Sequence, residues 1–115
     1  MNKFLKSFTY AFKGLTYTFR TQLNFKVHCI AAIIIILLGF YFKLSTAEWM
    51  WISLMIALVL VVELINTAIE ILVDLISPLQ HPKAGAIKDI AAAAVLIAAL
   101  LSIAIGLFIF VPKFI

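Results

Sequence analysis

The most informative part of the sequence is Val61-Val62-Glu63-Leu64-Ile65-Asn66-Thr67-Ala68-Ile69-Glu70-Ile71-Leu72-Val73-Asp74. It is apolar enough for a membrane span, yet it holds three of the five acidic residues of the chain. At 100° per residue, Glu70 and Asp74 fall within about 20° of Glu63 around a helix, with Asn66 about 60° to one side. Ionisable groups inside a membrane helix are costly unless they meet a partner, a cavity or the interface. This acidic face therefore predicts a functional site, because a seam that only joins helices usually needs one amide and not three carboxylates.

The composition is that of an integral membrane protein. Of the 115 residues, 66% are hydrophobic, and the mean hydropathy is +1.22, too apolar for an ordinary soluble domain and too short for more than one domain. The net charge is +4, and its distribution favours a cytoplasmic N-terminus over a nucleic-acid surface. Five cations precede the first long apolar run, namely Lys3, Lys6, Lys13, Arg20 and Lys26. The single Cys29 cannot form an intramolecular disulfide.

The hydrophobic pattern predicts an all-α membrane protein made of one membrane-embedded domain over residues 1–115. Cations alternate with aromatic and aliphatic residues over 1–24, which is typical of an amphipathic helix lying in the membrane surface. Long apolar runs predict three transmembrane helices, over 27–42, 46–76 and 88–112.

Local signals set the ends of the middle span. Ser45 and Glu48 have the spacing of a capping box at its start, and Ser77-Pro78 ends it. At 1.5 Å per residue the helix is long enough to extend beyond the hydrocarbon. The segment 78–86 contains two prolines and a glycine and predicts an ordered cytoplasmic loop.

This topology places the acidic end of the middle span and Lys88-Asp89 at the same cytoplasmic level. Carboxylates with an amide are hard oxygen ligands that suit Mg²⁺, which leaves its remaining positions to water and phosphate oxygens. A lysine opposite them can neutralise phosphate charge. Together they favour phosphoryl transfer at the membrane surface, although the chain has neither a GxxxxGK[ST] loop nor the motifs of soluble kinases.

These residues resemble the small prokaryotic diacylglycerol kinases and their undecaprenol kinase relatives. The resemblance covers nearly the whole chain and is carried by Ser7-Phe-Thr-Tyr-Ala-Phe-Lys-Gly-Leu15, Asn24-Phe-Lys-Val-His28, Glu63-Leu-Ile-Asn-Thr-Ala-Ile-Glu-Ile-Leu-Val-Asp74, His81-Pro82 and Lys88-Asp-Ile-Ala-Ala-Ala-Ala-Val-Leu-Ile97. It implies a homotrimer in the bacterial inner membrane, with composite active sites between subunits. The implied reaction uses MgATP to phosphorylate the hydroxyl of a membrane lipid alcohol, undecaprenol or diacylglycerol.

The resemblance also implies roles for individual residues. Glu63 would be the base that acts on the lipid hydroxyl, Glu70 a metal ligand, and Asn66 a polar partner in the nucleotide site. Lys88 would contact the nucleotide phosphates. The residues bordering the nucleotide would be Tyr10, His81, Gly85 and Asp89. Asp74 belongs to the motif without an assigned role.

One position departs from the family pattern. Members commonly carry a glutamate where this chain has Gln22, and that glutamate is a second metal ligand. The amide oxygen of Gln22 can still bind a metal ion, although with less charge. The departure therefore concerns the details of metal binding more than the reaction class.

Other readings of the sequence compete with the kinase. A small ion- or proton-conducting oligomer could line a pore with the acidic face. A pore would need polar residues along the whole helix, however, and between Met50 and Val62 the only polar residue is Ser53. An accessory membrane subunit would need neither the acidic face nor Lys88-Asp89. Residues 24–28 resemble the undecaprenol kinases more than the diacylglycerol kinases, which favours undecaprenol as the substrate. His28 lacks the other ligands of a zinc site, which indicates a structural role.

The oligomer is also expected on physical grounds. Three transmembrane helices of one chain would enclose the acidic face poorly, and an exposed Glu63 deep in the membrane would be costly. Neighbouring subunits are therefore expected to cover Glu63.

Overall fold

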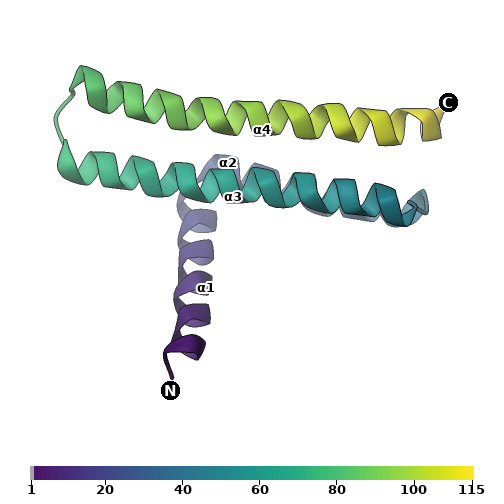
Figure 1. Ribbon diagram of the computed structural model, residues 1–115, viewed down its shortest axis with the longest axis horizontal. Helices are drawn as coiled ribbons and strands as arrows, with labels where there is room; N and C mark the ends of the chain where they lie inside the picture. The colour runs from purple at the N-terminus through teal and green to yellow at the C-terminus, as the bar shows by residue number, and fades with distance from the viewer. Residues whose placement is uncertain (1) are drawn as a thin grey trace.

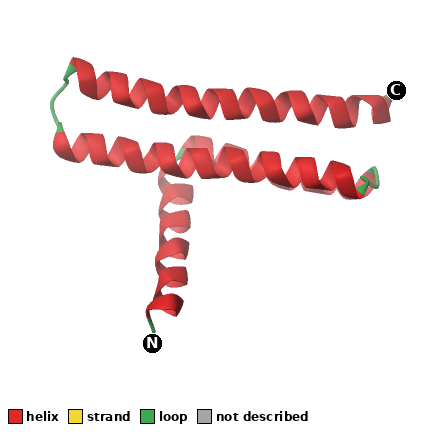
Figure 2. Ribbon diagram, in the orientation of Figure 1, coloured by secondary structure: helices red, strands yellow, loops and turns green. Residues whose placement is uncertain are grey.

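The computed structural model describes residues 2–115, and all the regular secondary structure in that range is helical (Figure 2). The helices are α1 (Lys3–Thr21), α2 (Leu23–Tyr41), α3 (Thr46–Ile76) and α4 (Pro82–Phe114). The last three are long and apolar enough to cross a membrane. The predicted all-helical fold, with three helices long and apolar enough to span a membrane, is thus confirmed.

Helix α3 lies at the centre of the fold. It packs against α4 along much of its length and against α2 on another side, while α1 runs away from the bundle, transverse to the other three helices (Figure 1). The molecule measures 52 × 43 × 21 Å along its principal axes. Helix α1 meets the bundle partway along α3. The C-terminal end of α3 and the start of α4 therefore extend beyond the level of α1 (Figure 1).

The ends of α3 follow the local signals in its sequence. The Ser45 hydroxyl accepts a hydrogen bond from the Glu48 N–H (3.2 Å), and the Ser45 N–H donates to Oε1 of Glu48 (2.9 Å). The predicted capping box is therefore present. The helix ends at Ile76, before Ser77-Pro78, and its 31 residues give a length of about 46 Å.

Two predicted helix ranges are wrong at their ends. Helix α2 begins at Leu23, earlier than the predicted range of 27–42, because a single extended residue, Gln22 (φ −114°, ψ 111°), separates it from α1. Helix α4 begins at Pro82 and ends at Phe114, whereas the prediction was 88–112. Pro82 is suited to the first helical position, where its missing N–H is not needed, so the loop that connects α3 and α4 is shorter than predicted.

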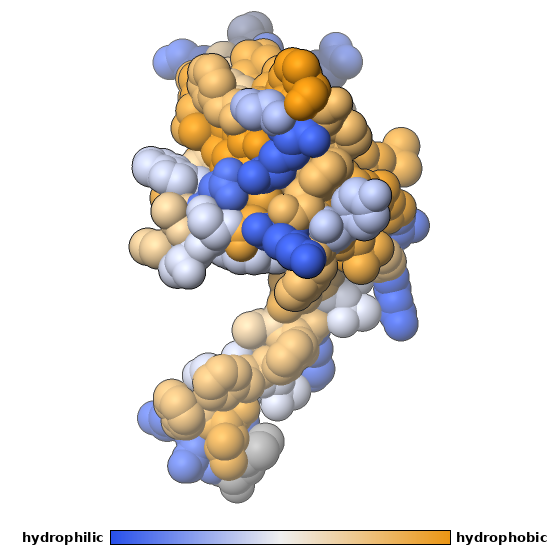
Figure 3. All heavy atoms as spheres, turned by 90° about the vertical axis from the view of Figure 1, so that its right-hand side faces the viewer, coloured by the Kyte–Doolittle hydropathy of each residue, from blue (hydrophilic) through white to orange (hydrophobic). Residues whose placement is uncertain are grey.

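The end of the bundle where α3 begins and α4 ends is held together by a small apolar core. Leu44, Ile52 and Phe110 are buried there, and an ion pair between Lys113 and Glu48 (3.2 Å) joins the end of α4 to the start of α3. Seen from the end where the C-terminus lies, the surface is mainly hydrophobic, with a small group of hydrophilic side chains (Figure 3). Such a surface suits contact with lipid or with other helices.

Candidate active site

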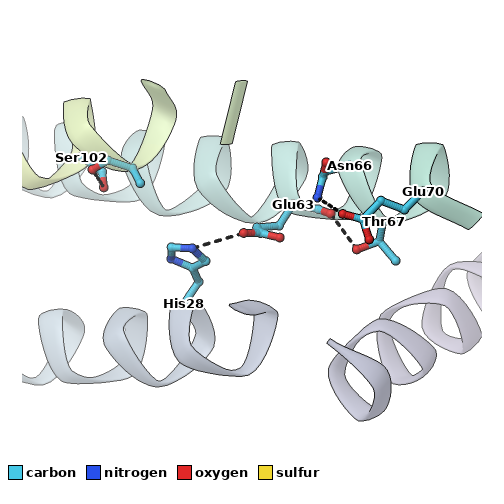
Figure 4. A network of polar contacts seen from close by, with 7 residues as sticks. His28, Glu63, Asn66, Thr67, Glu70 and Ser102 are labelled. Atoms are coloured by element: carbon cyan, nitrogen blue, oxygen red, sulfur yellow. Dashed lines mark hydrogen bonds and ion pairs between the residues drawn. The ribbon is translucent and has the colours of Figure 1, made fainter. Parts of the chain in front are cut away.

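Glu63 is buried in the bundle and contacts a histidine from the neighbouring helix. Its residue exposure is 2%, and its Oε1 lies 3.3 Å from Nε2 of His28 on α2 (Figure 4). The His28 side chain is 26% exposed, so it lies between the buried carboxylate and the surroundings. A carboxylate at this depth needs such a polar partner, because an unpaired buried charge is strongly unfavourable.

Asn66 and Glu70 form a second polar pair, further along α3. Nδ2 of Asn66 donates a hydrogen bond to Oε1 of Glu70 at 3.0 Å (Figure 4). Asn66 is buried and Glu70 is half-buried. Thr67, also buried, donates its hydroxyl hydrogen to the carbonyl oxygen of Glu63 (3.0 Å) and fixes the helix locally.

This pair has the donor set of a magnesium site. Oδ1 of Asn66 is buried without a hydrogen-bond partner among the described residues 2–115, although its amide nitrogen is paired. Buried polar atoms are rarely left in this state, so an oxygen atom of this kind beside a carboxylate fits a hard cation. Within the same range no group of three or more His, Cys, Asp or Glu residues could hold a metal ion. Mg²⁺ does not require such a cluster, since it usually takes one or two carboxylates together with water and substrate phosphates.

A cleft where α3 ends and α4 begins gathers several of the predicted nucleotide residues. It has a volume of about 580 Å³, and its lining includes Asp74, His81, Gly85 and Lys88. The Lys88 ammonium forms a salt bridge with the Asp74 carboxylate, joining α4 to α3. Nδ1 of His81 accepts a hydrogen bond from the Lys83 N–H (3.1 Å) and caps α4. Two charged groups, one of each sign, are thus presented to a cleft large enough for part of a nucleotide.

Three predicted site residues form no hydrogen bond or ion pair with these groups within residues 2–115. Tyr10 is 65% exposed on α1, with the Lys13 ammonium 5.8 Å from the centre of its ring. Gln22 lies at the junction of α1 and α2, where its amide nitrogen donates to the Thr21 hydroxyl (3.4 Å). Asp89 is exposed and does not belong to the lining of the cleft. Side-chain contacts and the lining of the cleft therefore connect one part of the predicted site within residues 2–115, and Tyr10, Gln22 and Asp89 are not among the residues they connect.

The contact of His28 with Glu63 is not predicted by the sequence. The sequence suggested only a structural role, because Cys29 beside it did not complete a metal site. The partner of His28 is 35 positions away on another helix, and only the packing of α2 on α3 brings the two side chains together. One sequence signal could have indicated this contact: His28 is a titratable residue inside an apolar segment, at a membrane depth similar to that expected for Glu63.

The burial of Glu63 also corrects an expectation. Neighbouring subunits were expected to cover this carboxylate, but α2 and the rest of the same chain already reduce its exposure to 2%. Burial of Glu63 is thus not a reason for oligomerisation. Chemically, the arrangement offers a buried carboxylate that can accept a proton, an amide–carboxylate pair that can hold a cation, and a lysine that can hold phosphate.

Comparison with known proteins identifies the family. The family model for prokaryotic diacylglycerol kinase matches residues 9–110. The chain is 49% identical over 113 residues to undecaprenol kinase from Bacillus subtilis (strain 168), an alignment that covers 98% of this chain and 92% of that protein. It is 38% identical over 103 residues to diacylglycerol kinase from Synechocystis sp. (89% of this chain, 59% of that protein).

A more distant relative agrees. Diacylglycerol kinase from Escherichia coli (strain K12) is 28% identical over 101 residues, which cover 88% of this chain and 83% of that protein. The family model spans all four helices, including the acidic face of α3, the cleft and the start of α4. The chain belongs to the prokaryotic diacylglycerol kinase family.

Proposed function

We propose that this chain is a lipid kinase that transfers the γ-phosphate of ATP to the hydroxyl of undecaprenol at the cytoplasmic surface of the bacterial inner membrane. The reaction class is supported by membership in a family of lipid kinases. Undecaprenol is supported by the name of the relative from Bacillus subtilis, and diacylglycerol is the alternative substrate, since other relatives carry that name. The family assignment also favours the kinase over an ion-conducting oligomer.

The observation that carries the proposal is the order of polar groups along α3. Glu63 lies about 26 Å from the start of the helix, close to the far edge of a hydrocarbon layer of about 30 Å. Glu70 and Asp74 lie about 36 and 42 Å along, beyond that edge. A lipid hydroxyl can therefore reach Glu63 from the membrane, while ATP can approach Glu70 and the cleft from water.

The proposed reaction uses Glu63 as the base. An oxygen of its carboxylate accepts the proton of the lipid hydroxyl as the hydroxyl oxygen bonds to the γ-phosphorus, and the bond to the leaving ADP oxygen breaks. Bound Mg²⁺ would neutralise charge on the ATP phosphates, and Glu70, the Asn66 amide oxygen and Gln22 are the residues that would hold it. Lys88 stabilises the phosphate groups, with Tyr10, His81, Gly85 and Asp89 bordering the nucleotide.

The protein is proposed to act as a homotrimer with sites shared between subunits and with its N-terminus in the cytoplasm. Tyr10, Gln22 and Asp89 form no hydrogen bond or ion pair with the Asn66–Glu70 pair within residues 2–115 of one chain, which agrees with a site completed by a neighbour. The five cations before Val27 support the cytoplasmic N-terminus, and the transverse course of α1 supports its place in the membrane surface (Figure 1).

The test is a kinase assay on the purified protein with labelled ATP, Mg²⁺ and each lipid in mixed micelles. We expect label in the lipid product, faster with undecaprenol than with diacylglycerol. Absence of transfer to both lipids would reject the kinase, and faster transfer to diacylglycerol would reverse the substrate assignment.

Two variants test the assignment of roles in the same assay. Glu63→Gln keeps the shape of the side chain and removes the base, so kcat is expected to fall about 10²- to 10⁴-fold while nucleotide affinity stays near normal. Glu70→Gln is expected to weaken MgATP binding as well as turnover. Turnover of Glu63→Gln close to the wild-type rate would show that Glu63 is not the base.

A further inference from the structure

The contact between His28 and Glu63 has no role in the reaction as proposed above. Nε2 of His28 lies 3.3 Å from Oε1 of Glu63, and the two side chains come from different helices (Figure 4). Among residues 2–115, His28 supplies the only Lys, Arg or His nitrogen within ion-pair distance of Glu63. The Thr67 hydroxyl nearby bonds to the backbone carbonyl of Glu63 and not to its carboxylate.

The Glu63 carboxylate must be held in a fixed orientation to act as a base. The glutamate side chain has several rotatable bonds, and proton transfer requires its oxygen to lie within about 2.6–3.2 Å of the hydroxyl. Misplacement by about 1 Å can cost about 100-fold in rate. A hydrogen bond to one carboxylate oxygen from a ring held on another helix removes this freedom and leaves the second oxygen free.

The chemistry of the two groups sets the direction of the hydrogen bond. A carboxylate that acts as a base is ionised and can only accept hydrogen bonds, so the hydrogen must lie on Nε2 of the imidazole. This bond also stabilises the buried charge of Glu63, whose side chain is 3% exposed.

We propose that His28 is a positioning residue for phosphoryl transfer: its Nε2–H donates to Oε1 of Glu63 and holds the carboxylate so that Oε2 faces the lipid hydroxyl. The inference rests on the proposed function, because it assigns a role within that reaction. It adds α2 to the helices that build the site.

The length of the side chain provides a sharp test. The amide nitrogen of glutamine reaches about as far from the backbone as Nε2 of histidine, whereas that of asparagine reaches only as far as Nδ1. His28→Asn is therefore expected to lower kcat about 10- to 100-fold, the size expected from losing a hydrogen bond to a charged group. KM for both substrates is expected to change less than about threefold, since the lost interaction acts on the transition state. His28→Gln is expected to recover most of kcat.

Two further variants keep the test decisive. His28→Phe keeps the ring without the donor and is expected to match His28→Asn, so the result does not depend on the folding of one variant. Because His28 acts through Glu63, adding His28→Asn to Glu63→Gln is expected to lower kcat by less than about twofold more. Helix content by circular dichroism and MgATP affinity are measured for every variant.

The results that would contradict the positioning role differ from those that would contradict the proposed function. A kcat of His28→Asn or His28→Phe within about twofold of wild type, a His28→Gln variant no faster than His28→Asn, or fully additive losses in the double variant would each overturn the positioning role. Wild-type protein without kinase activity on either lipid would overturn the proposed function, and this inference with it.

Discussion

Carboxylates on one face of α3 have very different surroundings, and this difference suits them to different proposed roles. Glu63 is buried and paired with His28, Glu70 is half-buried and receives a hydrogen bond from Asn66, and Asp74 is exposed and paired with Lys88. A proton acceptor benefits from a site without water, whereas a metal ligand and a phosphate site must be reached by solvated ATP. The gradient of burial along the helix therefore matches the order of steps from lipid to nucleotide.

Gln22 provides a test of the metal site at a single position. If its amide oxygen replaces a carboxylate ligand, Gln22→Glu adds a negative charge to that site and is expected to tighten Mg²⁺ binding. Gln22→Ala is expected to lower activity less than Glu70→Ala does. The measurement is kinase rate against Mg²⁺ concentration for the three variants. An unchanged Mg²⁺ dependence in Gln22→Glu would place Gln22 outside the metal site.

Asn66 is expected to be needed for MgATP binding beyond its contribution to stability. Asn66→Leu keeps the number and branching of the side-chain heavy atoms but removes the donor to Glu70 and the buried amide oxygen, so MgATP affinity is expected to fall at least tenfold. Thr67→Val is the matched control, because it removes a buried hydroxyl one residue away and costs about 1 kcal/mol of stability without touching Glu70. Equal MgATP affinities in the two variants, measured by titration, would contradict a role for Asn66 in the site.

At this scale the sequence predicted the polar positions on α3 but not their partners. The acidic face follows from helical spacing alone, because all its residues belong to one helix. The contacts of Glu63 with His28 and of Asp74 with Lys88 depend on how helices pack, and a single apolar sequence contains little information on which faces meet. The family resemblance indicated Lys88 as a phosphate ligand without indicating its salt bridge.

At the scale of whole helices, strong local sequence signals predicted the ends of the helices well, and weak signals did not. The capping box at Ser45 and the Ser77-Pro78 stop place the ends of α3 where they are found. Helix α4 begins earlier than the predicted residue 88, because Pro82 and Gly85, which are typical of loops, belong to its first turns. Proline at the first helical position favours a helix, and Gly85 is tolerated inside the first turns when the rest of the helix is strongly apolar.

Packing between α2 and α3 depends on a glycine. A Cβ atom added to Gly39 would lie 2.5 Å from Cη2 of Trp49, whose ring also packs against Phe40. Gly39→Ala is therefore expected to destabilise the protein by about 1–3 kcal/mol. Gly106→Ala in α4 is the control, because no atom lies within 4 Å of its added Cβ, and alanine in a helix is expected to be neutral or to stabilise by about 0.5–1 kcal/mol. Denaturation midpoints in micelles measure both, and equal stability of the two variants would contradict the close α2–α3 contact.

At the scale of the whole molecule, charge predicts the orientation in the membrane. The connector between α3 and α4 is expected in the cytoplasm and the C-terminus outside, since these lie at opposite ends of the bundle (Figure 1). In a Cys29→Ala background, Leu79→Cys is expected to react with a membrane-impermeant thiol reagent only from the cytoplasmic side, and Ile115→Cys only from outside. Both positions are exposed, at 82% and 97%. Labelling of Ile115→Cys from the cytoplasm alone would reverse the topology.

The distance between Glu63 and Lys88 of the same chain supports an active site shared between subunits. Lys88 contacts Asp74, which is eleven residues, or about 16 Å, along α3 from Glu63. Phosphoryl transfer requires the lipid oxygen and the γ-phosphorus to approach to about 3–3.5 Å. A phosphate held by Lys88 where it now lies is too far from a hydroxyl at Glu63 of the same chain. Bringing Lys88 of a neighbouring subunit to Glu63 would remove this gap.

Mixed oligomers test this arrangement directly. Glu63→Gln and Lys88→Ala chains are each expected to be nearly inactive when prepared alone. If each site combines Glu63 of one subunit with Lys88 of another, mixed trimers contain some sites with both residues intact, so activity is expected to return after the two variants are unfolded together and reassembled. A mixture of chains that carry both substitutions with wild-type chains provides the control for reassembly, and mass measurement in nanodiscs gives the number of subunits. Mixtures of the single variants that assemble as trimers yet stay inactive would show that each site uses Glu63 and Lys88 of the same chain.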